Sequence, residues 1–491
     1  MGIMQISREV AETMIKNKKL DDDAFAAQRK EILSLWHTGK EANLDEAVAY
    51  NKSFPAEKNV VRRLRRAKAN KEIFASTGMG KSTVEEHIEL LQFVEKEGDA
   101  DLLSISVDSF TRYNRFEEVQ KHMEESIKTG KSKLNGVPVV NIGVPGVRRI
   151  VESVKCPVCL RGGTPDGRLL AEVLFAGGVN FYTPDLFMDF WQHSAKTPYD
   201  FVVETHQYIG RLMGIYEERG VPMLPNIQGF YGAGMPPSLQ SSSLMVSALL
   251  LAEQGLKNIS IKCVGHGNLV QDVASATARE SVLRYYLDKH GYSDVEIFKE
   301  LSFGLMQYPP DFEPSLAVMF MNTLMAALIG ATTSDIRTMA EAKAIPTKEN
   351  TADTYKIAKV MQNFIQTQKI EVNREELALQ IAMEEKEIRA IVDKVFEFGD
   401  GDILVGAAKA VEAGVLDNPF AANRAAAGKV LGVKDSEGAI RYFNTGNLPF
   451  SQEIIDYHKE KIAEREKKQG IKVGYDTLVN DLYSVSKGYL V

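Results

Sequence analysis

The sequence predicts an α/β fold built on a TIM (β/α)8 barrel, and three observations support this. Between residues 71 and 350, short segments rich in β-branched and aromatic residues alternate with amphipathic helical segments. Such alternation is typical of parallel strands covered by helices, and eight repeats would close a barrel. Residues 1–70 are highly charged with a helical pattern, and the strand signal fades after residue 350. We therefore expect an N-terminal helical extension over 1–70, a barrel over 71–350 and a C-terminal mainly helical region over 351–491.

In the N-terminal extension, the acidic segment 21–23 precedes a helical pattern over 24–36 and could cap that helix. The basic segment 59–66 has poor apolar spacing and is expected to be a solvated face.

Nine segments of the barrel region have strand character: 72–76, 102–107, 137–141, 156–159, 179–182, 222–226, 259–263, 295–299 and 333–337. A barrel takes eight strands, so at least one of these segments lies outside it, and the sequence does not show which. Beyond the barrel, amphipathic patterns predict helices over 351–369, 374–398 and 452–468.

The composition is that of an ordinary globular protein, with 491 residues, 44% hydrophobic residues and a net charge of −7. This charge argues mildly against nucleic acid as the main partner. Three cysteines make no disulfide framework, so a cytoplasmic location is expected. The start of the chain lacks the apolar core of a signal peptide, and the most apolar segment, 316–331, is too short to span a membrane. That segment is expected to be a buried helix.

Two arginines are the leading candidates for a functional site. Arg161 follows a short apolar segment and opens the glycine-rich run 161–172, and Arg112 lies in the run 107–115. Residues that follow barrel strands face the active-site mouth, and an arginine fork can bind a carboxylate in two places. The alternative is that each pairs with a local acid, such as Asp108 or Asp166, and the residues alone leave both possibilities open.

Residues 75–82 fit a loosened phosphate-loop pattern, with alanine in place of the first glycine and with Lys81 available to phosphate. Because this pattern is short and recurs by chance, a plain loop between a strand and a helix is the stronger interpretation. A P-loop nucleotide hydrolase is therefore only an alternative function. A non-catalytic barrel that serves as a binding partner is another.

No metal site is expected from this chain. Cys156 and Cys159 would need two further ligands at suitable spacing, and Cys263 and His266 lie far along the sequence. Paired cysteines in an apolar strand are more often core residues. The Asp-x-His-x-x-Gly motif that ligates cobalt is absent, and His266 is interpreted as a turn histidine.

The arginine runs resemble the large (epsilon) subunit of adenosylcobalamin-dependent glutamate mutase, also called methylaspartate mutase. The resemblance covers nearly the whole chain and includes the segments 38–41, 55–59, 86–91, 134–136, 176–178, 252–259, 330–332, 345–349 and 446–450. It implies an isomerase with a TIM barrel that binds adenosylcobalamin at its mouth. A small cobalamin-binding subunit of the sigma type would supply the cobalt-ligating histidine, and this chain would form a homodimer. The family reaction is a radical rearrangement of L-glutamate to 3-methylaspartate.

The resemblance also assigns positions. The expected cofactor contacts are Gly80, Asn135, Gly162, Tyr308, Arg337, Glu341 and Ile345. Arg337 stands where the family has lysine and would grip the ribose with Glu341, and Gly162 stands where the family has histidine. Arg112 and Arg161 fall on two of the three arginines that hold the substrate carboxylates.

Four substrate positions depart from the family pattern. Gly78 replaces the third arginine, Thr183 replaces the glutamate that receives the substrate ammonium, and Asp189 and His193 replace two tyrosines. Asp189 could take over as the ammonium partner. We therefore expect a mutase for a small carboxylic or amino acid other than glutamate, which should itself bind weakly.

Overall fold

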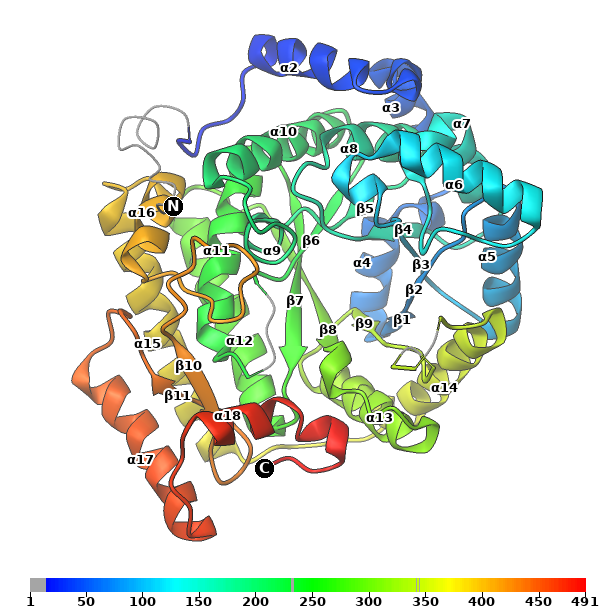
Figure 1. The fold of residues 1–491 in the computed structure, drawn as a ribbon. Coiled ribbons are helices and arrows are strands. Elements are labelled where there is room, and N and C mark those ends of the chain that lie inside the picture. Colours follow the sequence, from blue (N-terminus) through cyan, green and yellow to red (C-terminus); the bar gives the residue numbers. More distant parts are fainter. Residues whose placement is uncertain (1–14, 231–233, 341, 344) are drawn as a thin grey trace.

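The computed structural model describes residues 15–230, 234–340, 342–343 and 345–491. Parallel strands lie at its centre and helices surround them (Figure 1). The strands are β1 (Phe74–Ser76), β2 (Gly78–Met79), β3 (Leu103–Ser106), β4 (Val158–Arg161), β5 (Phe181–Tyr182), β6 (Leu224–Ile227), β7 (Asn258–Gly265), β8 (Glu296–Phe303) and β9 (Thr333–Asp335). The surrounding helices are α5 (Val84–Gly98), α6 (Phe116–Thr129), α7 (Val139–Glu152), α8 (Arg168–Ala176), α9 (Leu186–Trp191), α10 (Tyr199–Glu218), α11 (Pro237–Glu253), α12 (Leu269–Lys289) and α13 (Phe312–Leu328).

The strands form a curled parallel sheet in two hydrogen-bonded parts. One part has the order β1-β9-β8-β7-β6-β5, and the other has the order β2-β3-β4. Only Thr77 separates β1 from β2, so the two parts continue into each other there. Between β4 and β5 the described residues form no backbone ladder; instead, the N–H of Gly162 donates to Oγ1 of Thr183 at 3.2 Å.

Eight of the nine expected strands overlap β1 and β3 to β9, and residues 137–141 are the exception. Only Val137 makes a strand bridge, and α7 begins two residues later. Pro138 lies at the helix N-cap and has no N–H for a strand ladder. The buried apolar residues beyond it follow helical spacing: Val140, Val144, Val147 and Val151. This valine-rich segment therefore covers the sheet rather than joining it.

The N-terminal helices are α2 (Asp22–Ser34), α3 (Leu44–Ser53) and α4 (Val60–Asn70). The expected cap is confirmed, because the Asp21 side chain accepts the N–H of Ala24 at 2.8 Å. Arg62, Arg65 and Arg66 are exposed, so the basic side chains of 59–66 form the expected solvated face, but the expectation of poor apolar spacing is wrong. The apolar residues Val60, Val61, Leu64 and Ala67 are buried against residues at the amino ends of the strands, including Phe74, Phe181 and Leu224. Helix α4 therefore covers that end of the sheet with its apolar face, and its arginines lie on the opposite face of the helix.

The C-terminal region contains α14 (Lys348–Gln366), α15 (Arg374–Phe398), α16 (Ile403–Ala413), α17 (Gln452–Gln469) and α18 (Tyr475–Leu482). The three helices expected there correspond to α14, α15 and α17. An antiparallel hairpin of β10 (Leu431–Lys434) and β11 (Ile440–Asn444) was not expected. Helices α15 and α16 pack along α11 and α12, so this region extends the helical layer on one side (Figure 1).

Two smaller expectations are also settled. The three cysteines are free and buried, and the Cys156 thiol donates to the carbonyl of Ala100 at 2.7 Å, as expected for core residues. The apolar segment 316–331 lies mostly in α13, but this helix is only partly buried, since Phe320 is 40% exposed. Among the described helices, none combines the length and the apolar character that crossing a membrane would require.

Candidate active site at the carboxyl ends of the strands

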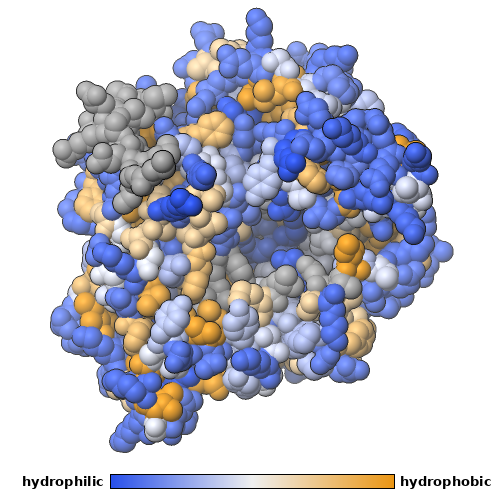
Figure 2. All heavy atoms as spheres, viewed as in Figure 1, coloured by the Kyte–Doolittle hydropathy of each residue, from blue (hydrophilic) through white to orange (hydrophobic). Residues whose placement is uncertain are grey.

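A cavity of about 190 Å³ lies at the carboxyl ends of the strands. Figure 2 shows the molecule hollowed at the centre of this face, with hydrophilic residues in the hollow. Five of the six positions singled out as clamp or pocket residues line it, and Asp189 lies behind it. The lining residues are Gly78, Ser106, Arg112, Arg161, Gly162, Gly163, Thr183, Asp185, Met188, His193, Asn226, Gln228, Lys262, Asp335 and Arg337.

A larger recess of about 660 Å³ opens elsewhere, between the end of α4, α13 and α14. It gathers residues near the amino end of β1, such as Glu72 and Phe74. We assign the candidate site to the smaller cavity because it collects charged side chains at the strand ends where barrel enzymes carry their chemistry.

Arg161 forms the floor of the cavity and is held by an acid that the sequence analysis missed. Its Nη1 lies 2.9 Å from Oε1 of Glu300, and its Nη2 lies 2.5 Å from Oε2. Its guanidinium also donates to the hydroxyls of Ser76 and Ser104 at 2.9 and 3.1 Å. The local acid considered from the sequence, Asp166, pairs with Arg168 instead. Both terminal nitrogens of the Arg161 guanidinium are therefore already bonded within the protein.

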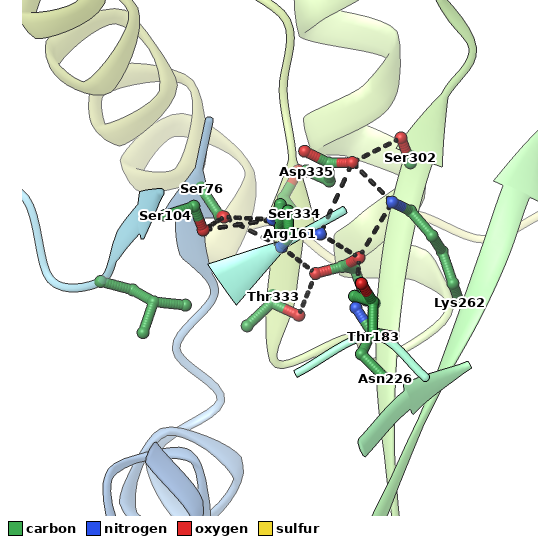
Figure 3. Close-up of polar contacts among 12 residues, drawn as sticks. Ser76, Ser104, Arg161, Thr183, Asn226, Lys262, Ser302, Thr333, Ser334 and Asp335 are labelled. Carbon is green, nitrogen blue, oxygen red and sulfur yellow. Dashed lines mark hydrogen bonds and ion pairs between the residues drawn. The ribbon is translucent and has the colours of Figure 1, made fainter. Parts of the chain in front are cut away.

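Lys262 and Asp335 complete a buried charge network around this pair. Lys262 Nζ lies 2.6 Å from Asp335 and 3.3 Å from Glu300, and Asn226 donates to Glu300 at 2.9 Å (Figure 3). Burial alone would raise the pKa of Glu300, but the charges of Arg161 and Lys262 outweigh it and lower that pKa. The same balance lowers the pKa of Asp335. Two cations thus face two carboxylates, and the floor carries no net charge.

Arg112 differs from Arg161, because no ion pair of its guanidinium occurs among the residues that the structure describes. Its one hydrogen bond there runs from Nε to the carbonyl of Val107 at 3.4 Å. Asp108, the local acid considered from the sequence, instead accepts the backbone N–H groups of Phe110 and Thr111 at 2.9 and 3.0 Å. Arg112 can therefore present its fork to a carboxylate in the cavity.

The close approach of Val107 and Arg112 to the backbone at position 162 requires glycine there. Its φ is +139°, and an added Cβ would lie 2.6 Å from Val107 Cγ1 and 2.9 Å from Arg112 Nη2. Gly78 is less confined, since an added Cβ would approach only the Ser106 hydroxyl closely, at 2.6 Å. Thr183 also lines the cavity, and its hydroxyl accepts the N–H of Gly162.

Asp189 does not face the cavity as an ammonium partner, because two histidines occupy its carboxylate. Oδ1 lies 2.6 Å from Nδ1 of His193, and Oδ2 lies 3.0 Å from Nε2 of His206. Burial would raise the pKa of Asp189, but these two hydrogen bonds outweigh it and lower that pKa. His193 lines the cavity, and Asp189 supports it from behind.

Comparison with known proteins shows the family. The model of the methylaspartate mutase E chain (MutE) family matches residues 54–491. The chain belongs to the methylaspartate mutase E chain family.

Proteins named glutamate mutase epsilon subunit are similar along their whole length. The one from Desulfitobacterium hafniense is 38% identical over 97% of this chain and 99% of its own. Those from Treponema denticola and Escherichia coli O157:H7 are 39% and 35% identical, again over 97% of this chain, and over 98% and 99% of their own. The resemblance predicted from the motifs is therefore confirmed. Among solved structures, tryptophan synthase subunit alpha from Legionella pneumophila aligns with 62% of this chain and 98% of its own, with 13% identity and a TM-score of 0.35, too weak a likeness to decide the fold.

Two of the positions expected to contact the cofactor, Gly162 and Arg337, line the cavity of this methylaspartate mutase family member. Arg337 lines the cavity, and its backbone N–H donates to the hydroxyl of buried Tyr308 at 3.3 Å. Asn135 accepts the N–H of Ser109 at 3.0 Å, and Ile345 is 82% exposed. Gly80 packs tightly, since an added Cβ would lie 2.5 Å from Gly136 Cα. Glu341 lies outside the described residues.

The phosphate-loop pattern does not fold as one. Gly78 and Met79 are extended and pair with β3, and α5 begins only at Val84, capped by Thr83. The N–H of Ser82 donates to the Ser132 hydroxyl at 2.9 Å. The helix start therefore does not wrap its N–H groups around a phosphate.

His266 lies away from the cavity, directly after β7. Its backbone N–H donates to the Asp272 carboxylate at 2.9 Å, and burial lowers the pKa of its side chain to about 3. This agrees with its interpretation as a turn histidine. Among the residues that the structure describes, no group of three or more metal-ligating side chains occurs.

Proposed function

We propose that this chain is the catalytic subunit of an isomerase, an adenosylcobalamin-dependent carbon-skeleton mutase that acts on a small carboxylic or amino acid other than glutamate. The observation that carries this proposal is the contrast between two arginines in one cavity. Arg112 presents a guanidinium without an ion pair among the described residues, while Arg161 is paired with Glu300. The names of the relatives support a mutase of this type.

We also infer that the curled sheet closes as an eight-stranded barrel. The two hydrogen-bonded parts join at β1 and β2, and among the described residues the one remaining seam lies between β4 and β5. The Gly162 to Thr183 hydrogen bond crosses that seam. Counting β1 and β2 as one interrupted strand leaves eight strand positions, the number that closes a TIM barrel.

The rim of the mouth fits a large, flat and partly apolar cofactor. Tyr113, Met306 and Ile345 follow β3, β8 and β9, and their side chains are 58%, 39% and 82% exposed. Such exposed apolar groups around a polar cavity mark a binding surface. In this proposal Asn135 and Arg337 would hold polar parts of adenosylcobalamin. When bound, that cofactor supplies the carbon radical that removes a hydrogen atom from the substrate.

The chain's own residues would bind, orient and enclose the substrate. Arg112 would grip one carboxylate, and the balanced floor of Arg161, Glu300 and Lys262 would form a rigid wall below it. Positioning of this kind, with exclusion of water, is the protein's usual share of radical cofactor chemistry. Glutamate would bind poorly, because Gly78 offers no fork and Arg161 is already paired.

Reconstitution with a small cobalamin-binding subunit tests this proposal. We expect weak binding of adenosylcobalamin by the chain alone in equilibrium dialysis and tight binding by the complex. Radical signals in electron paramagnetic resonance should appear with a suitable acid, while turnover of glutamate to 3-methylaspartate should be slow. Glutamate turnover at roughly 1–1000 per second would contradict the altered substrate. Assembly without a radical signal for any acid would favour the non-catalytic partner, and nucleotide hydrolysis without cobalamin would favour the hydrolase.

A further inference from the structure

One polar atom of His193 remains available to a ligand. The ring lines the cavity, and its Nδ1 is bonded to Asp189 at 2.6 Å. The other nitrogen, Nε2, has no hydrogen-bond partner among the described residues. An added Cβ at Gly163 would lie 2.3 Å from both the His193 ring and the Asp189 carboxylate, so glycine at that position lets the pair approach the cavity wall.

The proton on each ring nitrogen of His206 can be assigned from its partners. Nδ1 lies 2.7 Å from the carbonyl of Val202, which can only accept a hydrogen bond. Nε2 lies 3.0 Å from Asp189, which is ionised because its pKa is lowered. Both nitrogens therefore carry hydrogen, and His206 is an imidazolium. Consistently, burial alone would lower the pKa of His206, but Asp189 outweighs it and raises that pKa.

This assignment fixes what His193 shows to the cavity. The carboxylate of Asp189 is balanced by the charge of His206 and still accepts a hydrogen bond from Nδ1 of His193. In its neutral form, His193 then has its hydrogen on Nδ1 and a lone pair on Nε2. The cavity wall thus offers an acceptor where a ligand needs a donor.

Each of three carboxylates that the structure describes near the cavity already has hydrogen-bond partners within the protein. Asp335 is bonded to Lys262 at 2.6 Å, and Asp189 is held by two histidines. Asp185 accepts the N–H groups of Gln228 and Gly229 at 2.5 and 2.7 Å. A neutral donor such as a hydroxyl therefore suits Nε2 of His193 better than an ammonium does.

We propose that the cavity binds a small hydroxy acid with one carboxylate, which pairs with Arg112 while its hydroxyl donates to Nε2 of His193. Asp189 and His206 act as positioning residues that fix the His193 tautomer. The proposal rests on the proposed function and names its substrate class. Arg161 and Lys262 offer no free donor pair to a second carboxylate on the ligand, because they are paired with Glu300 and Asp335.

Calorimetric titration of four matched acids tests this assignment, both in the full chain alone and in its complex with the small subunit. Butyrate lacks the donor, 2-aminobutyrate replaces it by ammonium, and 2-hydroxyglutarate adds a carboxylate to 2-hydroxybutyrate. We expect 2-hydroxybutyrate to bind about tenfold tighter than each of the others, the effect of one good hydrogen bond or one unpaired charge. Equal or tighter binding of any of the other three, or no binding of any acid in either form, overturns the proposal.

Variants of His193 localise the effect. His193→Leu should reduce the affinity for 2-hydroxybutyrate to that for butyrate, while His193→Gln, which keeps an acceptor oxygen, should retain part of the difference. His290→Gln, at the distant end of α12, is the matched control and should change nothing. An unchanged ratio in a folded His193→Leu variant overturns the proposal.

A spectroscopic readout separates a positioning role of Asp189 from a structural one. With histidine labelled by 15N in the ring, the Nε2 signal of His193 should have the shift of an unprotonated nitrogen and should move when 2-hydroxybutyrate is added. Asp189→Ala should shift it towards the protonated form, since the tautomer is no longer held. A protonated Nε2 in the parent chain contradicts the assignment. Failure of the chain to assemble with the small subunit would instead contradict the proposed function. The ring signals of His193 do not depend on that assembly, so the two proposals can fail separately.

Discussion

Glu300 accepts hydrogen bonds from both terminal nitrogens of Arg161, at 2.9 and 2.5 Å, in the floor of the candidate active site. The carboxylate has no exposed surface, and the arginine side chain is 11% exposed. A fork that is engaged in this way cannot also grip a substrate carboxylate in two places. Of the two arginines expected to clamp the substrate, this pair therefore leaves only Arg112 without an ion pair among the described residues.

Glu300→Gln should destabilise the protein, because it removes one of two carboxylates that balance Arg161 and Lys262. Breaking a buried ion pair from one side costs about 3–5 kcal/mol. Glutarate, a ligand with two carboxylates, should restore part of this loss by supplying the missing charge. Chemical denaturation of the variant with and without glutarate measures both effects.

The control is Glu313→Gln, which alters an exposed glutamate in the first turn of α13. It should leave stability within about 0.5 kcal/mol of the parent. A Glu300→Gln variant as stable as this control would show that the floor does not depend on the pair.

The sequence could predict a contact in this site only where the two contacting residues are close together in the chain. Arg112 and Arg161 could be placed at the mouth, because each follows a segment of strand character. Their states could not be predicted, because Glu300 lies 139 residues from Arg161 and is recognised as its partner only when β8 and β4 face each other across the sheet. A signal was present in principle: charged residues inside otherwise apolar strands, such as Lys262 in β7, point to an inward-facing polar cluster.

The histidine pair shows the same limit at shorter range. Asp189 and His193 are four residues apart, so one helical turn could have predicted their contact. His206 lies on another helix, α10, and occupies the second carboxylate oxygen of Asp189. For the fold, period and composition predicted nine strands, of which eight are present. Residues 137–141 were misassigned, because valine suits a strand and a buried helix face alike.

Gly78→Arg should improve glutamate binding by restoring a third fork. An added Cβ would meet only the Ser106 hydroxyl closely, and that hydroxyl can rotate away. One additional charge-assisted contact should increase glutamate affinity about tenfold. Calorimetry with glutamate and with butyrate distinguishes a gained second contact from a general increase in acid binding.

The matched contrast is Gly80→Arg, two residues away. Its Cβ would lie 2.5 Å from Gly136 Cα, a backbone atom that cannot move aside. This variant should unfold at a lower temperature without gaining affinity. If Gly78→Arg binds glutamate no better than the parent does, Gly78 is not the position that limits the second carboxylate.

Glu384 should make stability fall as the pH rises. Burial between α15 and α12 raises its pKa from 4.5 to about 8, and the Ser275 hydroxyl donates to it at 2.7 Å. Above pH 4.5 the unfolded chain releases this proton while the folded chain retains it, so stability declines up to about pH 8. Glu384→Gln removes this titration and should flatten the decline in melting temperature between these two pH values. Glu375→Gln, at an exposed position of the same helix, should leave the slope unchanged.

Substitution of the two arginines by lysine should separate ligand binding from stability. Arg112→Lys keeps the charge but loses the fork, so acid binding should weaken by about 1.5–3 kcal/mol with little change in the free energy of unfolding. Arg161→Lys cannot satisfy Glu300, Ser76 and Ser104 together, so it should destabilise the fold by about 1–3 kcal/mol. The measurements are calorimetric titration with 2-hydroxybutyrate and chemical denaturation of both variants. The reverse pattern, in which Arg161→Lys abolishes binding in a fully stable protein, would return Arg161 to the role of a substrate clamp.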